Sequence, residues 1–198
     1  PIHLLVIRGI KMAVGLKKMR LCKKSYRCRL RMKKKTTYDL RTERMDYIFD
    51  THAHYDDEAF DADREEVLAG LKEQGVGTVV NVGASIASTK TTLALAEAHP
   101  FMYAAVGVHP NETAELTDAD MKWLESLAEN PKVVAIGEIG LDYYWDEPER
   151  EIQKHWFSAQ LEVTKKTGLP VIIHSRDAAK DTLDIMKAEH NGATGGVI

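Results

Sequence analysis

The sequence predicts an α/β fold of the (β/α)8 TIM-barrel class, incomplete here at about six of the eight βα units. From residue 45 onward, apolar runs alternate with segments of helical spacing, as parallel strands alternate with crossover helices. The runs are apolar throughout, which is typical of parallel strands covered on both faces. Four of these runs carry His or Glu at or just after their ends, where barrel enzymes place their catalytic residues, and no run is followed by the G-x-G-x-x-G of a dinucleotide-binding fold.

The first half of this pattern predicts three strands and two helices. The first helix has Val67, Leu68 and Leu71 on one face, acidic residues in its first turn and Gly75 just past its end. β-branched residues dominate the second strand, as expected for a buried position in a sheet. The strands are predicted at 47–50, 76–82 and 103–108, and the helices at 62–74 and 89–98.

The second half continues the same alternation. A helix at 117–130 is supported by Asp118 and Asp120, which place negative charge in its first turn. Gly195 begins another short apolar run that we interpret as the start of a sixth strand. The other strands are predicted at 133–139 and 169–174, and the other helices at 148–167 and 177–190.

The net charge of −3 is the sum of two unequal parts. Residues 1–44 hold 15 Lys and Arg and two acids, a net of +13, whereas residues 45–198 hold 12 basic and 28 acidic residues, a net of −16. We interpret 1–44 as a basic leader outside the domain. Three explanations stay open: upstream sequence translated because a true start at Met45 was missed, an organellar targeting segment, or a nucleic-acid-binding arm. Residues 45–198 are predicted to form the one domain.

Composition also predicts the surroundings in which the protein works. Two cysteines cannot build a disulfide framework, and residues 45–198 contain none. The chain has no apolar run near the ~20 residues that a membrane-crossing helix needs. We therefore expect a cytoplasmic protein that does not associate with membranes.

His52 and His54 follow the first predicted strand as an H-x-H pair. Residues i and i+2 of an extended segment point to one face, so both imidazoles can reach one cation. In isolation such a pair indicates two surface histidines in a loop, but the other strand ends favour a metal site. Asp50 lies one step back on the same face, where its carboxylate is predicted to orient a ligand.

Glu138 and His174 end two otherwise apolar strands. Burying a carboxylate there costs on the order of several kcal/mol, unless the carboxylate is paired with a cation or bound to a metal ion. We predict both side chains as metal ligands. The alternatives are a salt bridge from Glu138 to Arg176 and a hydrogen-bonded core position for His174.

His109 and Arg176 are predicted to contact substrate. His109 follows a strand in the motif Gly-Val-His-Pro, and Arg176 offers a planar fork that suits phosphate, with a structural ion pair as the alternative. Three further histidines lie on or at the ends of helices and are predicted to be at the surface: His99, His155 and His190.

The motifs DTHAH, GVHP, GEIGLDYY and PVIIHSRDA, in this order and spacing, resemble the TatD-type metal-dependent deoxyribonucleases, a branch of the amidohydrolase-like TIM-barrel metalloenzymes. The resemblance runs from about Tyr47 to Ile198. It implies two divalent ions (Mg, Mn or Zn), with His52 and His54 on one ion, Glu138 shared between two, and His174 on the second. Asp142, in the third motif, is predicted with Asp50 to support the ligands.

The family pattern also uses a later His and a later Asp, which this sequence does not reach. We therefore expect a chain truncated at its C-terminal side, and we assign no catalytic base within it. The expected function is hydrolysis of phosphodiester bonds in DNA, at ends or in single strands, by a metal-activated water at a two-metal site. We expect no obligate protein partner.

Two alternatives to a deoxyribonuclease stay open. One is another amidohydrolase-type reaction on an ester, amide or lactone. The other is a catalytically inactive fragment, because residues 45–198 number 154 whereas a complete barrel of this class takes about 250 residues.

Overall fold

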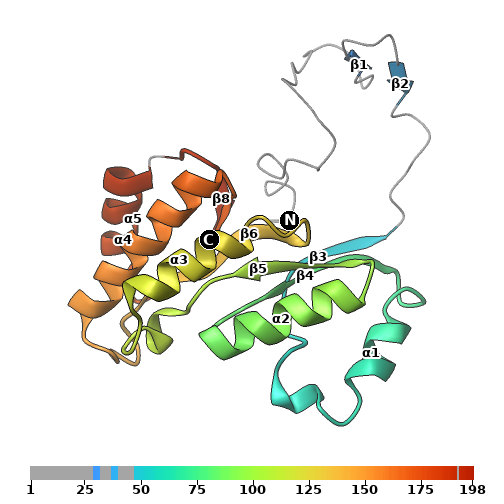
Figure 1. Cartoon of the computed structure of the whole chain (residues 1–198), viewed down its shortest axis with the longest axis horizontal. Coiled ribbons are helices and arrows are strands. Elements are labelled where there is room, and N and C mark those ends of the chain that lie inside the picture. Colours follow the sequence, from blue (N-terminus) through green and yellow to red (C-terminus); the bar gives the residue numbers. More distant parts are fainter. Residues whose placement is uncertain (1–28, 32–36, 40–46, 191) are drawn as a thin grey trace.

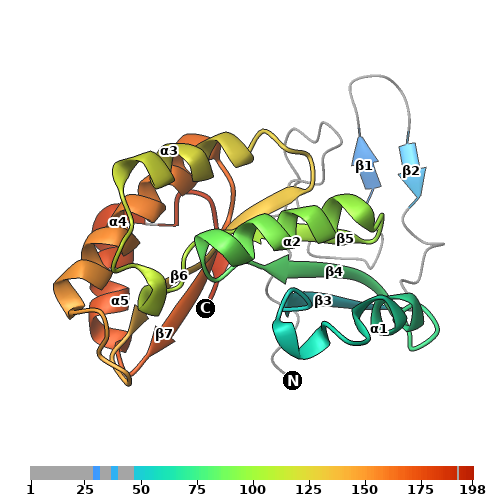
Figure 2. The ribbon, with the colours of Figure 1, turned by 60° about the horizontal axis from the view of Figure 1, so that its bottom comes forward.

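The computed structural model describes residues 29–31, 37–39, 47–190 and 192–198, and within them six parallel strands form one sheet. The strands pair in the order β3-β4-β5-β6-β7-β8, which follows the sequence. Figure 1 shows helices α2, α3 and α4 packed along the sheet, and Figure 2 shows how the sheet curls between β3 and β7. Consecutive parallel pairing with helices outside is barrel topology, so the predicted fold class is confirmed.

The strands and helices agree with the predicted alternation. The strands of this sheet are β3 (Ile48–Ala53), β4 (Val76–Val82), β5 (Met102–Val106), β6 (Val133–Asp142), β7 (Val171–Arg176) and β8 (Gly196–Val197). The helices are α1 (Arg64–Gly70), α2 (Ile86–Ala98), α3 (Asp118–Leu127), α4 (Arg150–Thr167) and α5 (Ala179–Ile185), with short helical turns at Glu58–Phe60, Pro110–Glu112 and Met186–His190. Among the helices described, none is both long and apolar enough to cross a membrane.

The basic leader predicted at 1–44 lies mostly outside the described residues. Its described part consists of β1 (Arg29–Arg31) and β2 (Thr37–Asp39), which pair antiparallel in a separate two-stranded sheet. The division of the chain at Met45 stays a prediction.

The apolar strands are buried on both faces. Val79, Ala104 and Val106 belong to the larger core cluster, which also contains Phe157 and Leu161 of α4. Their neighbours along the strands face the other way, in a second cluster that contains no helix residue and forms the inside of the curled sheet: Val80, Val82, Ala105, Ala135 and Ile172. This two-sided burial explains why the strands are apolar throughout rather than alternating.

Strand β6 continues three residues past its predicted end at Ile139. Its pairing with β7 places Gly140 beside His174 and Asp142 beside Arg176. Between Ile136 and Ile139, β6 holds one residue more than β7 does, so Glu138 lies at a bulge inside the strand rather than at its end. A Cβ at position 140 would collide with the carbonyl oxygen of His174, which explains the glycine there.

Candidate metal centre

The carboxyl end of β3 and the bulge in β6 bring His52, His54 and Glu138 together. The Nε2 atoms of the two histidines are 3.1 Å apart. Glu138 Oε2 lies 3.3 Å from Nε2 of His52 and 3.9 Å from Nε2 of His54. One ligand atom from each residue lies within 4.8 Å of the others, a spacing that one cation can span. We call these three residues the outer group.

The backbone of β4 orients His54. Its Nδ1 lies 2.8 Å from the carbonyl oxygen of Val82, which can only accept a hydrogen bond. Nδ1 therefore carries a hydrogen, and Nε2 is the ring nitrogen that faces His52 and Glu138. A ring held in this way is the usual arrangement of a metal-ligating histidine.

A second cluster, which we call the inner group, consists of His109, Asp142 and His174, whose ligand atoms also lie within 4.8 Å of one another. His174 Nε2 lies 3.0 Å from Asp142 Oδ2, and its Nδ1 lies 3.0 Å from Glu138 Oε1. The two oxygens of Glu138 thus face different groups, Oε2 the outer and Oε1 the inner. This is the placement that a carboxylate shared between two ions requires.

Burial and hydrogen bonding act in opposite directions on the charges here. Burial favours the neutral form of Glu138, but hydrogen bonds from His174 and His52 outweigh it and hold the pKa of Glu138 well below its ordinary value. Burial would likewise lower the pKa of His174, yet its bonds to Glu138 and Asp142 raise that pKa. The pKa of Asp142 is lowered in spite of burial, by the hydrogen bond from His174 and by backbone N–H groups. The site therefore keeps both carboxylates ionised.

His109 is neutral and oriented. Burial, and then the nearby charge of His174, lower its pKa to about 4. Its Nδ1 accepts a hydrogen bond from the backbone N–H of Asn111 at 3.3 Å, which leaves the ring hydrogen on Nε2. The ring lies 4.2 Å from that of His174, measured between centroids. In this tautomer Nε2 of His109 is a hydrogen-bond donor within the inner group.

Arg176 and Asp50 make contacts that the sequence did not indicate. The Arg176 guanidinium stacks over the ring of Tyr144, 3.7 Å from its centroid, and forms no ion pair within 4.0 Å among residues 47–190. The salt bridge considered between Arg176 and Glu138 is therefore not found, because Glu138 is paired with histidines. Asp50 Oδ1 accepts from the backbone N–H of His52 at 3.2 Å, so it contacts the backbone rather than a ring.

Two buried glutamines of α4 hold the strand ends that carry the inner group. Gln160 accepts from the N–H of Val108 at 2.8 Å and donates to its carbonyl at 3.0 Å. Gln153 does the same for Asp142, at 2.9 and 3.0 Å. Sequence reasoning missed both residues. The sequence feature that could have revealed them is a pair of glutamines seven positions apart on the apolar face of a predicted helix.

A second polar network, also missed, fixes the loop after the outer group. Asn81 Nδ2 donates to Asp56 Oδ1 at 2.7 Å and to Thr92 Oγ1 at 2.8 Å. Asn81 Oδ1 accepts from the backbone N–H of Tyr55, next to His54, at 2.6 Å. The prediction that His190 lies at the surface was wrong: its side chain is buried, with Nε2 2.9 Å from Thr194 Oγ1.

Comparison with known proteins gives one consistent family. The family model described as "TatD related DNase" matches residues 49–198. Among curated proteins, the chain is 42% identical over 151 residues to YabD of Bacillus subtilis, named an uncharacterized metal-dependent hydrolase, covering 76% of this chain and 59% of that protein. It is 33% identical over 141 residues to the TatD protein of Erwinia tasmaniensis, named a 3'-5' ssDNA/RNA exonuclease, covering 71% of this chain and 54% of that protein.

A solved structure matches as well. The crystal structure of the TatD homologue YjjV from Escherichia coli superposes with a TM-score of 0.67 at 35% identity, covering 73% of this chain and 57% of that one. The chain thus spans between half and three fifths of the length of these relatives.

Proposed function

Since the chain belongs to the TatD-related DNase family, we propose that it forms the metal-binding part of a phosphodiester hydrolase acting on single-stranded nucleic acid ends. The observation that supports this most is the position of Glu138, whose two oxygens face the outer group and His174 of the inner group. The relatives named as 3'-5' ssDNA/RNA exonucleases support the choice of substrate.

The donor atoms fit divalent metal ions. Nε2 of His52, Nε2 of His54 and Oε2 of Glu138 form one set, and Oε1 of Glu138 with the imidazole of His174 begins a second. Mixed imidazole and carboxylate sets suit Zn²⁺ or Mn²⁺ better than Mg²⁺, which prefers oxygen. We therefore propose two ions, one at each group, with Glu138 shared. When bound, such ions polarise a phosphoryl oxygen and supply a water nucleophile at neutral pH.

The other residues of the site have distinct proposed tasks. Neutral His109 carries its hydrogen on Nε2 and would donate to a phosphate oxygen beside the inner group. Arg176 would attract the phosphate by its charge, which matters in a domain of net charge −16. Asp142 would hold the ring of His174 through its Oδ2, at 3.0 Å.

A nuclease assay on the purified 198-residue chain tests this function. After metal removal by EDTA and separate addition of Mn²⁺, Zn²⁺ or Mg²⁺, we expect 3'-end trimming of a 5'-labelled single-stranded oligonucleotide that needs the added ion. Glu138→Gln should abolish trimming, whereas the control Glu162→Gln, on the exposed face of α4, should not. Metal-dependent hydrolysis of ester or lactone substrates without any trimming would contradict the proposal.

A cytoplasmic location also stays a proposal, resting on the cysteine content. Fractionation of cells that produce the tagged chain measures it directly, and recovery outside the cytoplasm would contradict it.

A further inference from the structure

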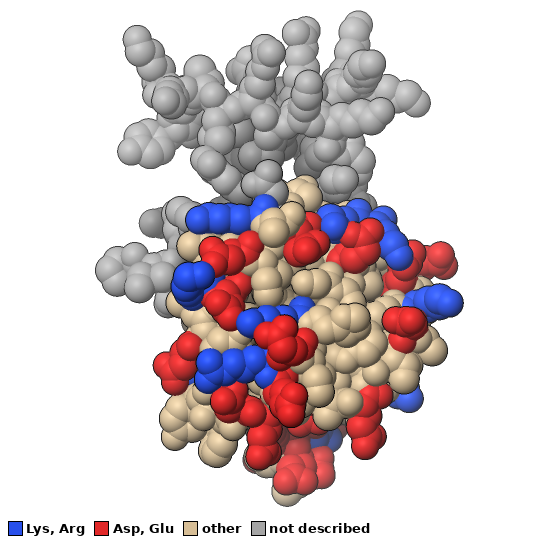
Figure 3. All heavy atoms as spheres, turned by 90° about the vertical axis from the view of Figure 1, so that its left-hand side faces the viewer, with Lys and Arg blue, Asp and Glu red and all other residues tan. Residues whose placement is uncertain are grey.

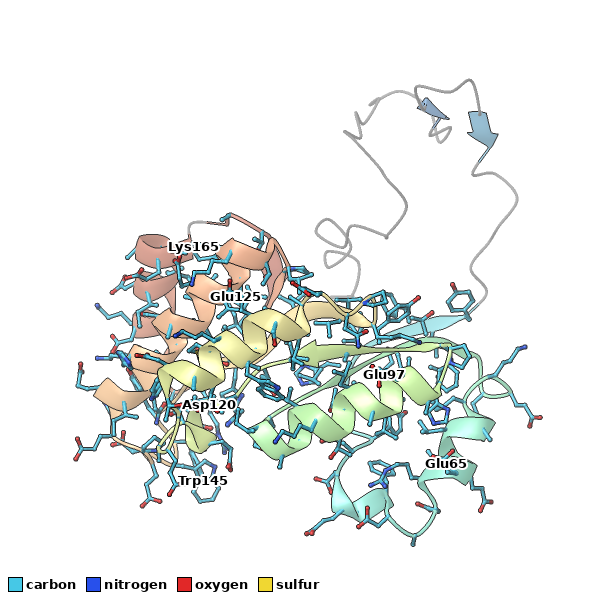
Figure 4. The ribbon with its side chains drawn as sticks, viewed as in Figure 1. Glu65, Glu97, Asp120, Glu125, Trp145 and Lys165 are labelled. Carbon is cyan, nitrogen blue, oxygen red and sulfur yellow. The ribbon has the colours of Figure 1, made fainter. Side chains whose placement is uncertain are left out.

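Two large aromatic side chains lie exposed immediately after β6. The side chain of Tyr144 is 55% exposed and that of Trp145 is 64% exposed. Their rings meet edge to face, with centroids 5.0 Å apart and planes at 88°. Trp145 lies in the middle of the loop between β6 and α4 and points away from the helices (Figure 4). Exposed aromatic pairs of this size are uncommon on a surface without a binding role.

The loop that carries them is held in place on several sides. Asp142 Oδ1 accepts from the backbone N–H of Tyr144 at 3.0 Å and from that of Trp145 at 3.4 Å. Further along the loop, Asn111 Nδ2 donates to the carbonyl of Glu147 at 2.7 Å. Arg150 then binds both carboxylate oxygens of Asp146, at 2.7 and 3.2 Å. A loop fixed in this way loses little conformational entropy when a ligand stacks on it.

The same loop is connected directly to the metal centre. Asp142 binds the two aromatic residues through Oδ1 and His174 through Oδ2, so one buried carboxylate joins the loop to the inner group. Arg176, two residues after His174, covers one face of Tyr144. Trp145 is the more exposed of the two rings and is therefore the one that can accept a partner. The Arg176 guanidinium lies over the neighbouring residue, Tyr144.

We propose that Trp145 is a stacking platform for an unpaired nucleobase, with Tyr144 and Arg176 supporting it, next to the phosphate that reacts at the metal centre. The inference rests on the proposed nuclease function and identifies how that site holds its substrate. Aromatic rings bind single strands by stacking on bases of any sequence. Acidic side chains are spread widely among basic ones on the face shown in Figure 3, so charge alone offers the nucleic acid little attraction there.

Binding measured by fluorescence anisotropy tests the platform. The probe is a labelled single-stranded oligonucleotide with phosphorothioate linkages to slow cleavage, titrated with the whole chain in Mn²⁺. Trp145→Ala should raise Kd roughly 5- to 100-fold, the range that loss of one stacked base corresponds to. Trp145→Phe should restore most of the affinity. Tyr47 is a 44% exposed aromatic residue just before β3, at the end of the strand away from His52. The control Tyr47→Ala should leave Kd unchanged.

Abasic substitutions locate the base and separate this inference from the nuclease proposal. At one position of the oligonucleotide, removing the base should weaken binding to the wild type but not to Trp145→Ala. DNA and RNA versions show whether the platform accepts both sugars. If the wild type binds and trims DNA while Trp145→Ala has the same Kd, the platform is wrong and the nuclease proposal stands. If the wild type binds no oligonucleotide, both fail together.

Discussion

The outer and inner groups of the metal centre differ in exposure and in what orients their ligands. The side chains of His52 and His54 are 36% and 41% exposed, whereas Asp142 of the inner group is 2% exposed. A backbone carbonyl orients His54, but a buried carboxylate orients His174. The difference teaches that the two histidines of the outer group converge through local sequence, whereas the inner group is assembled by strand pairing. Glu138, which reaches the outer histidines across the sheet, is the only residue in the described structure that pairs with histidines of both groups.

The largest expected effect follows from that shared position. Glu138→Gln removes the negative charge that faces both groups, so we expect affinity for Mn²⁺ or Zn²⁺ to fall at least about 100-fold at both sites, beyond the roughly 10- to 100-fold typical of supporting residues. Isothermal titration of the metal-free chain measures it. The control Glu162→Gln should bind metal as the wild type does. Loss of only one ion would show that Glu138 belongs to one group alone.

Removing one histidine from each group should separate the two sites. His54→Ala takes a ligand from the outer group only, and His174→Ala takes one from the inner group only. We expect each variant to lose about one ion, measured by elemental analysis after dialysis. A variant that loses both ions would mean that the groups are coupled through more than Glu138.

Gln160 tests whether α4 supports the inner group specifically. Gln160→Leu leaves the N–H and carbonyl of Val108 buried without their partner, at about 1–3 kcal/mol for each group. We expect the free energy of unfolding to fall by about 2–6 kcal/mol in urea denaturation, with metal lost first from the inner group. The exposed control Gln74→Leu should change stability by less than about 0.5 kcal/mol. An equally stable Gln160→Leu would refute the role of this contact.

The last expected effect, which vanishes at neutral pH, is a pH dependence that comes from His109. Its pKa of about 4 in the folded chain lies below the ordinary 6.5, so the unfolded chain binds more protons between these values. The stabilisation is complete above pH 6.5 and is lost as the pH falls toward 4, by up to about 3 kcal/mol. Unfolding in EDTA across this range should show a shallower loss in His109→Asn than in the wild type. Identical pH profiles would contradict a buried neutral His109.

The contrast between the groups also explains what the sequence could predict. His52 and His54 are two residues apart on one strand, so their convergence required only local geometry. Asp142 was predicted as a supporting residue, and that role stays a proposal. Its carboxylate reaches His174 because β6 pairs with β7 three residues further than its apolar run indicated.

Long-range contacts set the remaining limits on prediction. The bulge at Glu138 depends on the register between β6 and β7, which the composition of either strand does not determine. The stacking of Arg176 on Tyr144 depends on that same pairing. Gln160 binds the backbone of Val108, which is far away in sequence, and Gln153 binds the backbone of Asp142 across the loop that precedes α4. The residue types at the strand ends were enough to predict a metal site, whereas the hydrogen-bond partners of each ligand depend on the fold.

Anomalous diffraction from crystals of the chain soaked in Mn²⁺ tests the central claim most directly, namely that one carboxylate serves two metal sites. We predict two peaks on opposite sides of the Glu138 carboxylate, one contacting His52 and His54 and the other contacting His174. A single peak, or two peaks of which one does not contact Glu138, would contradict the account.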